Sequence, residues 1–177
     1  MPSFLSKLYG WLFGYPPQPQ PRIHCSAQVW QAGVEELARR TLRGRRESGA
    51  FLLGRDATGG GKQILEFVFY DDIDPHALDT GIVHFAGNRL PVLWEHCRQR
   101  GYGVVADVHV HPGGYGQSPS DQADPVMPRA GHIALILPHF AQRGVLPGEI
   151  GLYEYLGNDA WVDHSKSGKD FFRVGCI

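Results

Sequence analysis

The segment 104–110 constrains the fold most, because it is β-branched and apolar apart from Asp107 and His109. Such a run predicts a buried strand. Side chains alternate along a strand, so Asp107, His109 and His111 are expected on one face. The run Pro112-Gly113-Gly114 then predicts a turn. Two imidazoles on one face at the end of a buried strand are well placed to bind one metal ion.

A short helix is predicted to begin directly after this turn. Ser118 is a favoured N-cap, Pro119 a favoured first helical residue, and Asp121 suits the first turn. The turn can bring the Asp121 carboxylate to the two imidazoles. Two His and one Asp would leave a fourth position for water, which is typical of a catalytic zinc site. Asp124 is the alternative third ligand, but its greater distance from the cap favours Asp121.

A zinc-bound water needs a base, and a carboxylate is the usual choice in metal hydrolases. Glu47 is the candidate, because it stands at the mouth of an apolar strand beside Gly49; the alternative is an ordinary surface glutamate. Ser118 could stabilise an oxyanion, or serve only as a helix cap. Asp107 could orient a ligand imidazole, or only satisfy backbone donors.

The remaining histidines and the cysteines have no recognisable motif. We expect structural or surface roles for three of the histidines: His84, His132 and His139. The three cysteines show neither a metal spacing nor a disulfide framework, which indicates idle thiols in a reducing cytoplasm: Cys25, Cys97 and Cys176.

The chain has 177 residues, which suits one domain with a sizeable core. Its formal net charge of −1 gives no general basis for binding nucleic acid or an anionic membrane. A local arginine cluster is expected to be a solvated helix end: Arg39, Arg40, Arg43, Arg45 and Arg46.

Residues 1–21 are expected to be an appendage to a domain that spans 22–177. Apolar residues at helical spacing predict an amphipathic segment, and a proline-rich spacer follows it. This segment is too short to span a bilayer and lacks the features of a signal peptide. With Lys7 as its single charge, membrane contact is disfavoured.

Strands dominate the rest, so the predicted class is α/β or α+β around one mixed sheet. Two main helices are expected, from Ala27 to about Leu42 and from Leu90 to Arg100, the second with Trp94 on its apolar face. The expected strands cover residues 22–25, 47–54, 63–70, 80–86, 104–110, 132–137, 151–155, 160–162 and 171–174.

Taken together, Glu47, the run His109-Val110-His111-Pro112 and the pair Ser118 and Asp121 resemble the signature of the JAB/JAMM (MPN+) metallopeptidases. The resemblance spans roughly residues 22–165. It implies a JAB/MPN (cytidine deaminase-like) fold, in which a curved sheet is flanked by helices, and one catalytic zinc. It also implies cleavage after the C-terminus of ubiquitin or a ubiquitin-like protein.

By position, the resemblance makes His109, His111 and Asp121 the zinc ligands, Glu47 the general base and Ser118 the oxyanion stabiliser. One departure concerns spacing, because six residues separate His111 from Ser118 where the family usually has seven. We therefore expect a loop that is one residue shorter.

The short form is similar to the JAB peptidases of bacterial ubiquitin-like conjugation operons, some of which serve anti-phage defence. This similarity implies E1-like and E2-like proteins as further partners. The substrate tail is expected to add to a sheet edge near residues 70–90. The alternatives are a zinc-free scaffold that binds a ubiquitin-like partner and a peptidase that processes a sulfur-carrier protein.

Overall fold

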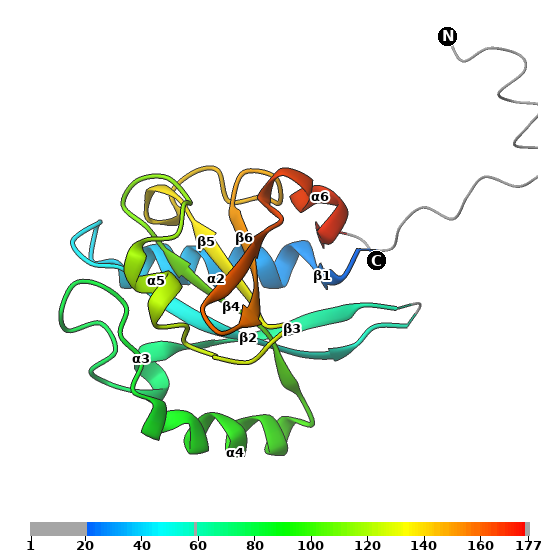
Figure 1. The fold of residues 1–177 in the computed structure, drawn as a ribbon. Coiled ribbons are helices and arrows are strands. Elements are labelled where there is room, and N and C mark those ends of the chain that lie inside the picture. Colours follow the sequence, from blue (N-terminus) through cyan, green and yellow to red (C-terminus); the bar gives the residue numbers. More distant parts are fainter. Residues whose placement is uncertain (1–20, 59, 176–177) are drawn as a thin grey trace, which may run out of the picture.

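A computed structural model describes residues 21–58 and 60–175 of the chain, which form a mixed α+β structure. A curled eight-stranded sheet has the order β7-β6-β5-β4-β2-β3-β1-β8 (Figure 1). Strand β4 pairs in parallel with β5, β1 pairs in parallel with β3 and β8, and the other neighbours are antiparallel. The expected class, one mixed sheet flanked by helices, is therefore confirmed.

The strands are β1 (Ile23–Cys25), β2 (Gly49–Asp56), β3 (Lys62–Phe69), β4 (Gly103–Val110), β5 (Ile133–Leu137), β6 (Gly151–Gly157), β7 (Ala160–Asp163) and β8 (Phe172–Val174). The α-helices are α2 (Ala27–Arg40), α3 (Tyr70–Ile73), α4 (Leu90–Arg100), α5 (Pro119–Ala123) and α6 (Gly168–Phe171). Three short 3-10 turns are η1 (Gly87–Arg89), η2 (His139–Ala141) and η3 (Ser165–Ser167).

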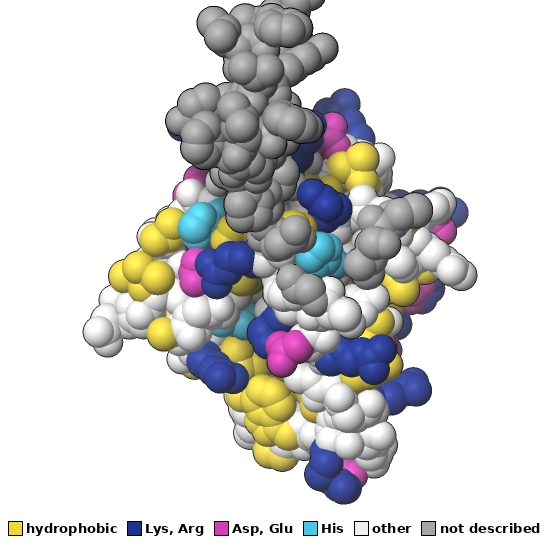
Figure 2. Space-filling model, turned by 90° about the vertical axis from the view of Figure 1, so that its right-hand side faces the viewer, with side chains coloured by type: hydrophobic (Ala, Val, Ile, Leu, Met, Phe, Trp, Pro, Cys, Tyr) yellow, Lys and Arg dark blue, Asp and Glu magenta, His cyan; other side chains and the backbone are white. Residues whose placement is uncertain are grey.

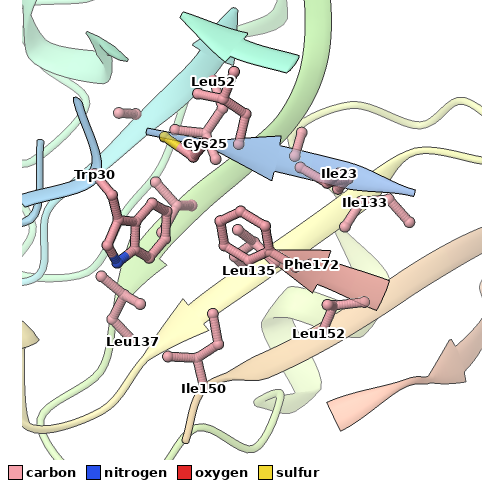
Figure 3. Close-up of a cluster of buried hydrophobic side chains, with 14 of the residues drawn as sticks. Ile23, Cys25, Trp30, Leu52, Ile133, Leu135, Leu137, Ile150, Leu152 and Phe172 are labelled. Atoms are coloured by element: carbon pink, nitrogen blue, oxygen red, sulfur yellow. The ribbon is translucent and has the colours of Figure 1, made fainter. Parts of the chain in front are cut away.

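Alternation along the central strands builds two cores, one on each face of the sheet. Leu52 of β2 and Trp30 of α2 belong to the larger core (Figure 3). Ala50, Val34 and Leu37 belong to the same core. Phe51 and Leu53 face the other way and pack with Leu93 and Cys97 of α4. The same alternation sends Val108 toward the first core, so that Asp107 and His109 belong to the second face.

Several sequence predictions are corrected at element ends. Helix α2 stops at Arg40, because Leu42 and Arg43 adopt positive φ values of 52° and 63°. Strand β2 begins at Gly49, so Glu47 precedes the strand instead of opening it. Trp94 of α4 is 45% exposed and lies outside the apolar face predicted for that helix.

The strand predicted at 80–86 is absent from the described residues. His84 N–H instead donates to Ala77 O, and Ala86 N–H donates to the Asp74 carboxylate, so this segment folds back on its own loop. The edges of the sheet are β7 and β8, so the expected sheet edge near residues 70–90 is wrong.

Part of the arginine cluster is paired with acidic side chains, namely Arg39, Arg40 and Arg46. Arg40 forms ion pairs with Glu36, Asp71 and Asp72. On another face of the molecule, Lys and Arg side chains are interspersed with acidic and apolar ones (Figure 2). Among the described residues no helix has the length and apolarity that a membrane crossing needs. The amphipathic segment expected near the N-terminus and Cys176 lie outside the described residues.

Candidate metal centre

Strand β4, the residue that follows it and helix α5 bring three potential metal ligands together. The Nε2 atoms of His109 and His111 lie 3.0 Å apart. Asp121 places Oδ1 3.4 Å from His109 Nε2 and Oδ2 3.2 Å from His111 Nε2. The structure thus joins Asp121, and not Asp124, to the two imidazoles.

The spacing of these atoms fits a small tetrahedral ion. A tetrahedral metal bound at about 2.0–2.1 Å holds its ligand atoms about 3.3–3.4 Å apart. The three separations of 3.0, 3.4 and 3.2 Å are close to that edge length. Two neutral nitrogens and one carboxylate oxygen would leave the fourth corner open, so this donor set fits a metal with one exchangeable position.

The electrostatics of the group favour a charge on the carboxylate. Burial opposes ionisation of Asp121, but the imidazoles of His109 and His111 and the Ser118 N–H hold its pKa far below the usual range. Burial also opposes a charge on His109, yet Asp121 outweighs it and raises the pKa of His109. The carboxylate therefore stays ionised at neutral pH, in the form that a metal needs.

Helix α5 positions Asp121 through the capping box that the sequence predicts. Asp121 N–H donates to Ser118 Oγ at 3.2 Å, and Ser118 N–H donates to Asp121 Oδ2 at 2.6 Å. Pro119 occupies the start of the helix, where a missing N–H costs nothing. The cap therefore fixes the carboxylate that faces the imidazoles.

Glu47 reaches the same place from the segment just before β2. Gly49 pairs with His109, and Val110 N–H donates to Ser48 O, so the antiparallel register carries Glu47 to the level of His111. Val83 N–H donates to Glu47 Oε2 at 3.2 Å. Glu47 lines a cavity of about 370 Å³ together with His111, Ser118 and Asp121.

Asp107 has two partners that the sequence did not reveal. Its Oδ2 accepts from the Tyr70 hydroxyl at 2.8 Å, and its Oδ1 lies 2.6 Å from His132 Nε2. Among the described residues it forms no hydrogen bond to His109 or His111, so it does not orient a ligand imidazole in this way. His132 therefore has a specific buried partner, and no sequence motif joins these two residues.

A second cavity, of about 460 Å³, is also lined by Asp121. His109, Asp107 and His132 line it, as do Asp124 and Trp161. The two cavities share Val83, Ser120 and Asp121 among their lining residues, so they meet at the ligand group. At least one potential ligand, Asp121, therefore borders both cavities.

No protein-family model matches the chain. It is similar in structure to a protein from Desulfitobacterium hafniense, with 15% identity and a TM-score of 0.58, over 86% of this chain and 92% of that chain. A protein from Salinibacter ruber strain DSM 13855 shares 13% identity at a TM-score of 0.50, over 79% of this chain and 87% of that chain. Likenesses at such identities establish the fold alone.

Proposed function

We propose that the chain is a zinc metallopeptidase of the JAB/MPN type, which hydrolyses the bond after the C-terminus of a ubiquitin-like protein. The observation that carries the proposal is the convergence of His109, His111 and Asp121 beside Glu47. A carboxylate next to an open metal position is the arrangement that metal-assisted hydrolysis requires.

Zinc fits the donor set, and His109, His111 and Asp121 would hold it. When bound, zinc would supply a Lewis acid for the scissile carbonyl and lower the pKa of an attacking water. Among divalent ions the two imidazoles favour zinc over magnesium or calcium, which prefer oxygen ligands.

Glu47 is the proposed general base. Its Oε2 accepts from the Val83 N–H, and Oε1, which has no hydrogen bond within the described residues, can accept a proton and then deliver it to the leaving amine. Glu47 is half-buried, so a bound substrate would shield it further from water.

Ser118 is the proposed oxyanion stabiliser. Its Oγ accepts from the Asp121 N–H, and this leaves the hydroxyl hydrogen available for a developing negative charge. The same serine can therefore cap helix α5 and donate to the reacting carbonyl group.

The substrate tail would lie along the two cavities that Asp121 lines. Val83, His84 and Phe85 line the larger of the two cavities, so the tail would pass along this loop. Partners of the E1-like and E2-like classes belong to the same proposal. So does a cytoplasmic location, which the free, buried thiols of Cys25 and Cys97 suit.

The test is cleavage of a panel of ubiquitin-like proteins, each fused at its C-terminus to a fluorescent reporter. Cleavage that a chelator abolishes and added zinc restores would support the proposal. A protein that binds one zinc but cuts no fusion would instead indicate a scaffold, and one that cuts only a sulfur-carrier fusion would change the substrate class.

A further inference from the structure

A left-handed turn follows strand β5. His139, Phe140 and Ala141 have φ values of 53°, 54° and 59°, a conformation that residues with a Cβ rarely adopt. The turn is closed by Ala141 N–H to Pro138 O at 3.0 Å and Gln142 N–H to His139 O at 3.1 Å. Three unfavourable residues in succession persist only where the surrounding contacts hold them, and such sites cluster near functional groups.

The turn holds the backbone around His111. Phe140 N–H donates to His111 O at 2.8 Å, and His139 N–H donates to Gly113 O at 2.9 Å. Both N–H groups therefore donate to the segment that follows β4. The His111 N–H donates to Leu137 O at 2.9 Å. Residues 137–140 therefore bind both the N–H and the carbonyl oxygen of His111.

The side chain of Phe140 reaches the loop that leads to Glu47. A Cβ placed on Gly44 would stand only 3.2 Å from the ring of Phe140, so the ring lies directly on this glycine. Gly44 has a φ of 77° and donates its N–H to Thr41 Oγ1, which fixes the loop in its turn. Glu47 therefore lies between two fixed points, Gly44 under the ring and Ser48 paired with β4.

We propose that Phe140 is a positioning residue that sets the place of Glu47 relative to His111. The Phe140 N–H donates to the backbone of His111, and the Phe140 ring packs on the loop that leads to Glu47. One residue therefore contacts both the segment of a potential ligand and the segment of the proposed base. The catalytic consequence rests on the proposed function, whereas the structural coupling does not.

The test compares Phe140→Ala and Phe140→Leu with a matched control, Phe67→Ala. Phe67 is also a half-buried phenylalanine that packs on the larger core, but it lies against Gly33 of α2. Three readouts are taken on each purified protein: zinc content, kcat and KM for the fusion that the wild type cleaves, and hydrogen exchange of the segment 41–49.

We expect Phe140→Ala to keep its zinc, to lose about 10- to 100-fold in kcat and to change KM less than twofold, because misplacement of a reacting group acts mainly on the chemical step. Exchange should quicken at 41–49 in this variant and not in Phe67→Ala. Phe140→Leu should restore most of the kcat.

Equal kcat per folded molecule in Phe140→Ala and Phe67→Ala would overturn the assignment, and so would unchanged exchange at 41–49. If the wild type cleaves no fusion, the proposed function fails, and the exchange comparison still decides whether Phe140 holds the Glu47 loop.

Discussion

The hydroxyl of Tyr70 donates a 2.8 Å hydrogen bond to Asp107, two residues before the potential ligand His109. The ring of Tyr70 occupies the space beside Gly49, where a Cβ would lie 2.3 Å from Tyr70 Cε2. Because Gly49 has no side chain, the buried Tyr70 ring can pass beside β2 and reach β4. This contact ties the face that carries His109 to the second core.

Gly49→Ala should therefore destabilise the fold. A methyl group at this position meets the Tyr70 ring and Val108 O, and relief requires the ring to move. Overpacking of a buried site costs about 1–3 kcal/mol, so urea denaturation should show a loss of that size. Gly103→Ala on β4 is the control, because a Cβ there meets nothing within 4 Å. Equal stability of the two variants would contradict the packing described for Tyr70.

Tyr70 also predicts a loss of stability at alkaline pH. Burial, followed by the charge of Asp107, raises the pKa of Tyr70 well above 10 in the folded chain. The unfolded chain releases this proton near pH 10. The contribution of Tyr70 to the free energy of unfolding is therefore complete below that pH and is lost as pH rises. Above pH 10 the free energy of unfolding should fall by about 1.4 kcal/mol per pH unit.

Tyr70→Phe should remove this slope, and the measurement is the free energy of unfolding from pH 8 to 11. The variant should start about 1.5–3 kcal/mol less stable at pH 8, because a hydrogen bond to a buried carboxylate is lost. Tyr115→Phe, on an exposed side chain, is the control. An unchanged slope in Tyr70→Phe would assign the alkaline loss to other groups.

The local rules made the ligand group predictable from sequence. Strand alternation placed His109 and His111 on one face, and the capping box placed Asp121 on the first turn of α5. These patterns act over a few residues, so no knowledge of the rest of the fold was needed. The loop between His111 and Ser118 had only to bring Asp121 to the two imidazoles, and it does so.

The pairing of Asp107 with His132 and Tyr70 could not be predicted in this way. Those residues come from β4, the segment before β5, and α3, and they meet only because of the order of the strands. The strand expected at 80–86 failed for a related reason. Val83 and Phe85 pack against the second core from a loop, which local periodicity cannot distinguish from a strand.

Asp121→Asn should separate the proposed metal role of this residue from its capping role. Asparagine keeps a side-chain oxygen for the Ser118 N–H, so α5 should persist, but it removes the anionic ligand. Because even an outer-sphere partner is worth about 10–100-fold in metal affinity, loss of this ligand should weaken zinc binding by at least about 100-fold.

The measurement is zinc titration, with the thermal shift on zinc addition as a second readout. Asp124→Asn is the control, because Asp124 lies outside the ligand group. Should Asp124→Asn lose zinc while Asp121→Asn keeps it, the third ligand has been misassigned.

Glu47→Gln should abolish turnover and leave zinc bound. Gln keeps the oxygen that accepts from the Val83 N–H, so the local structure is preserved, but it cannot take up a proton at neutral pH. Loss of a general base costs about 10²- to 10⁴-fold, which should appear in kcat for the reporter fusion.

Glu35→Gln on the exposed side of α2 is the control and should cleave at the wild-type rate. Retained zinc in Glu47→Gln rules out a collapsed site as the cause of any loss. If Glu47→Gln cleaves as fast as Glu35→Gln, the carboxylate beside His111 is not the base, and the proton must move through another group of the cleft.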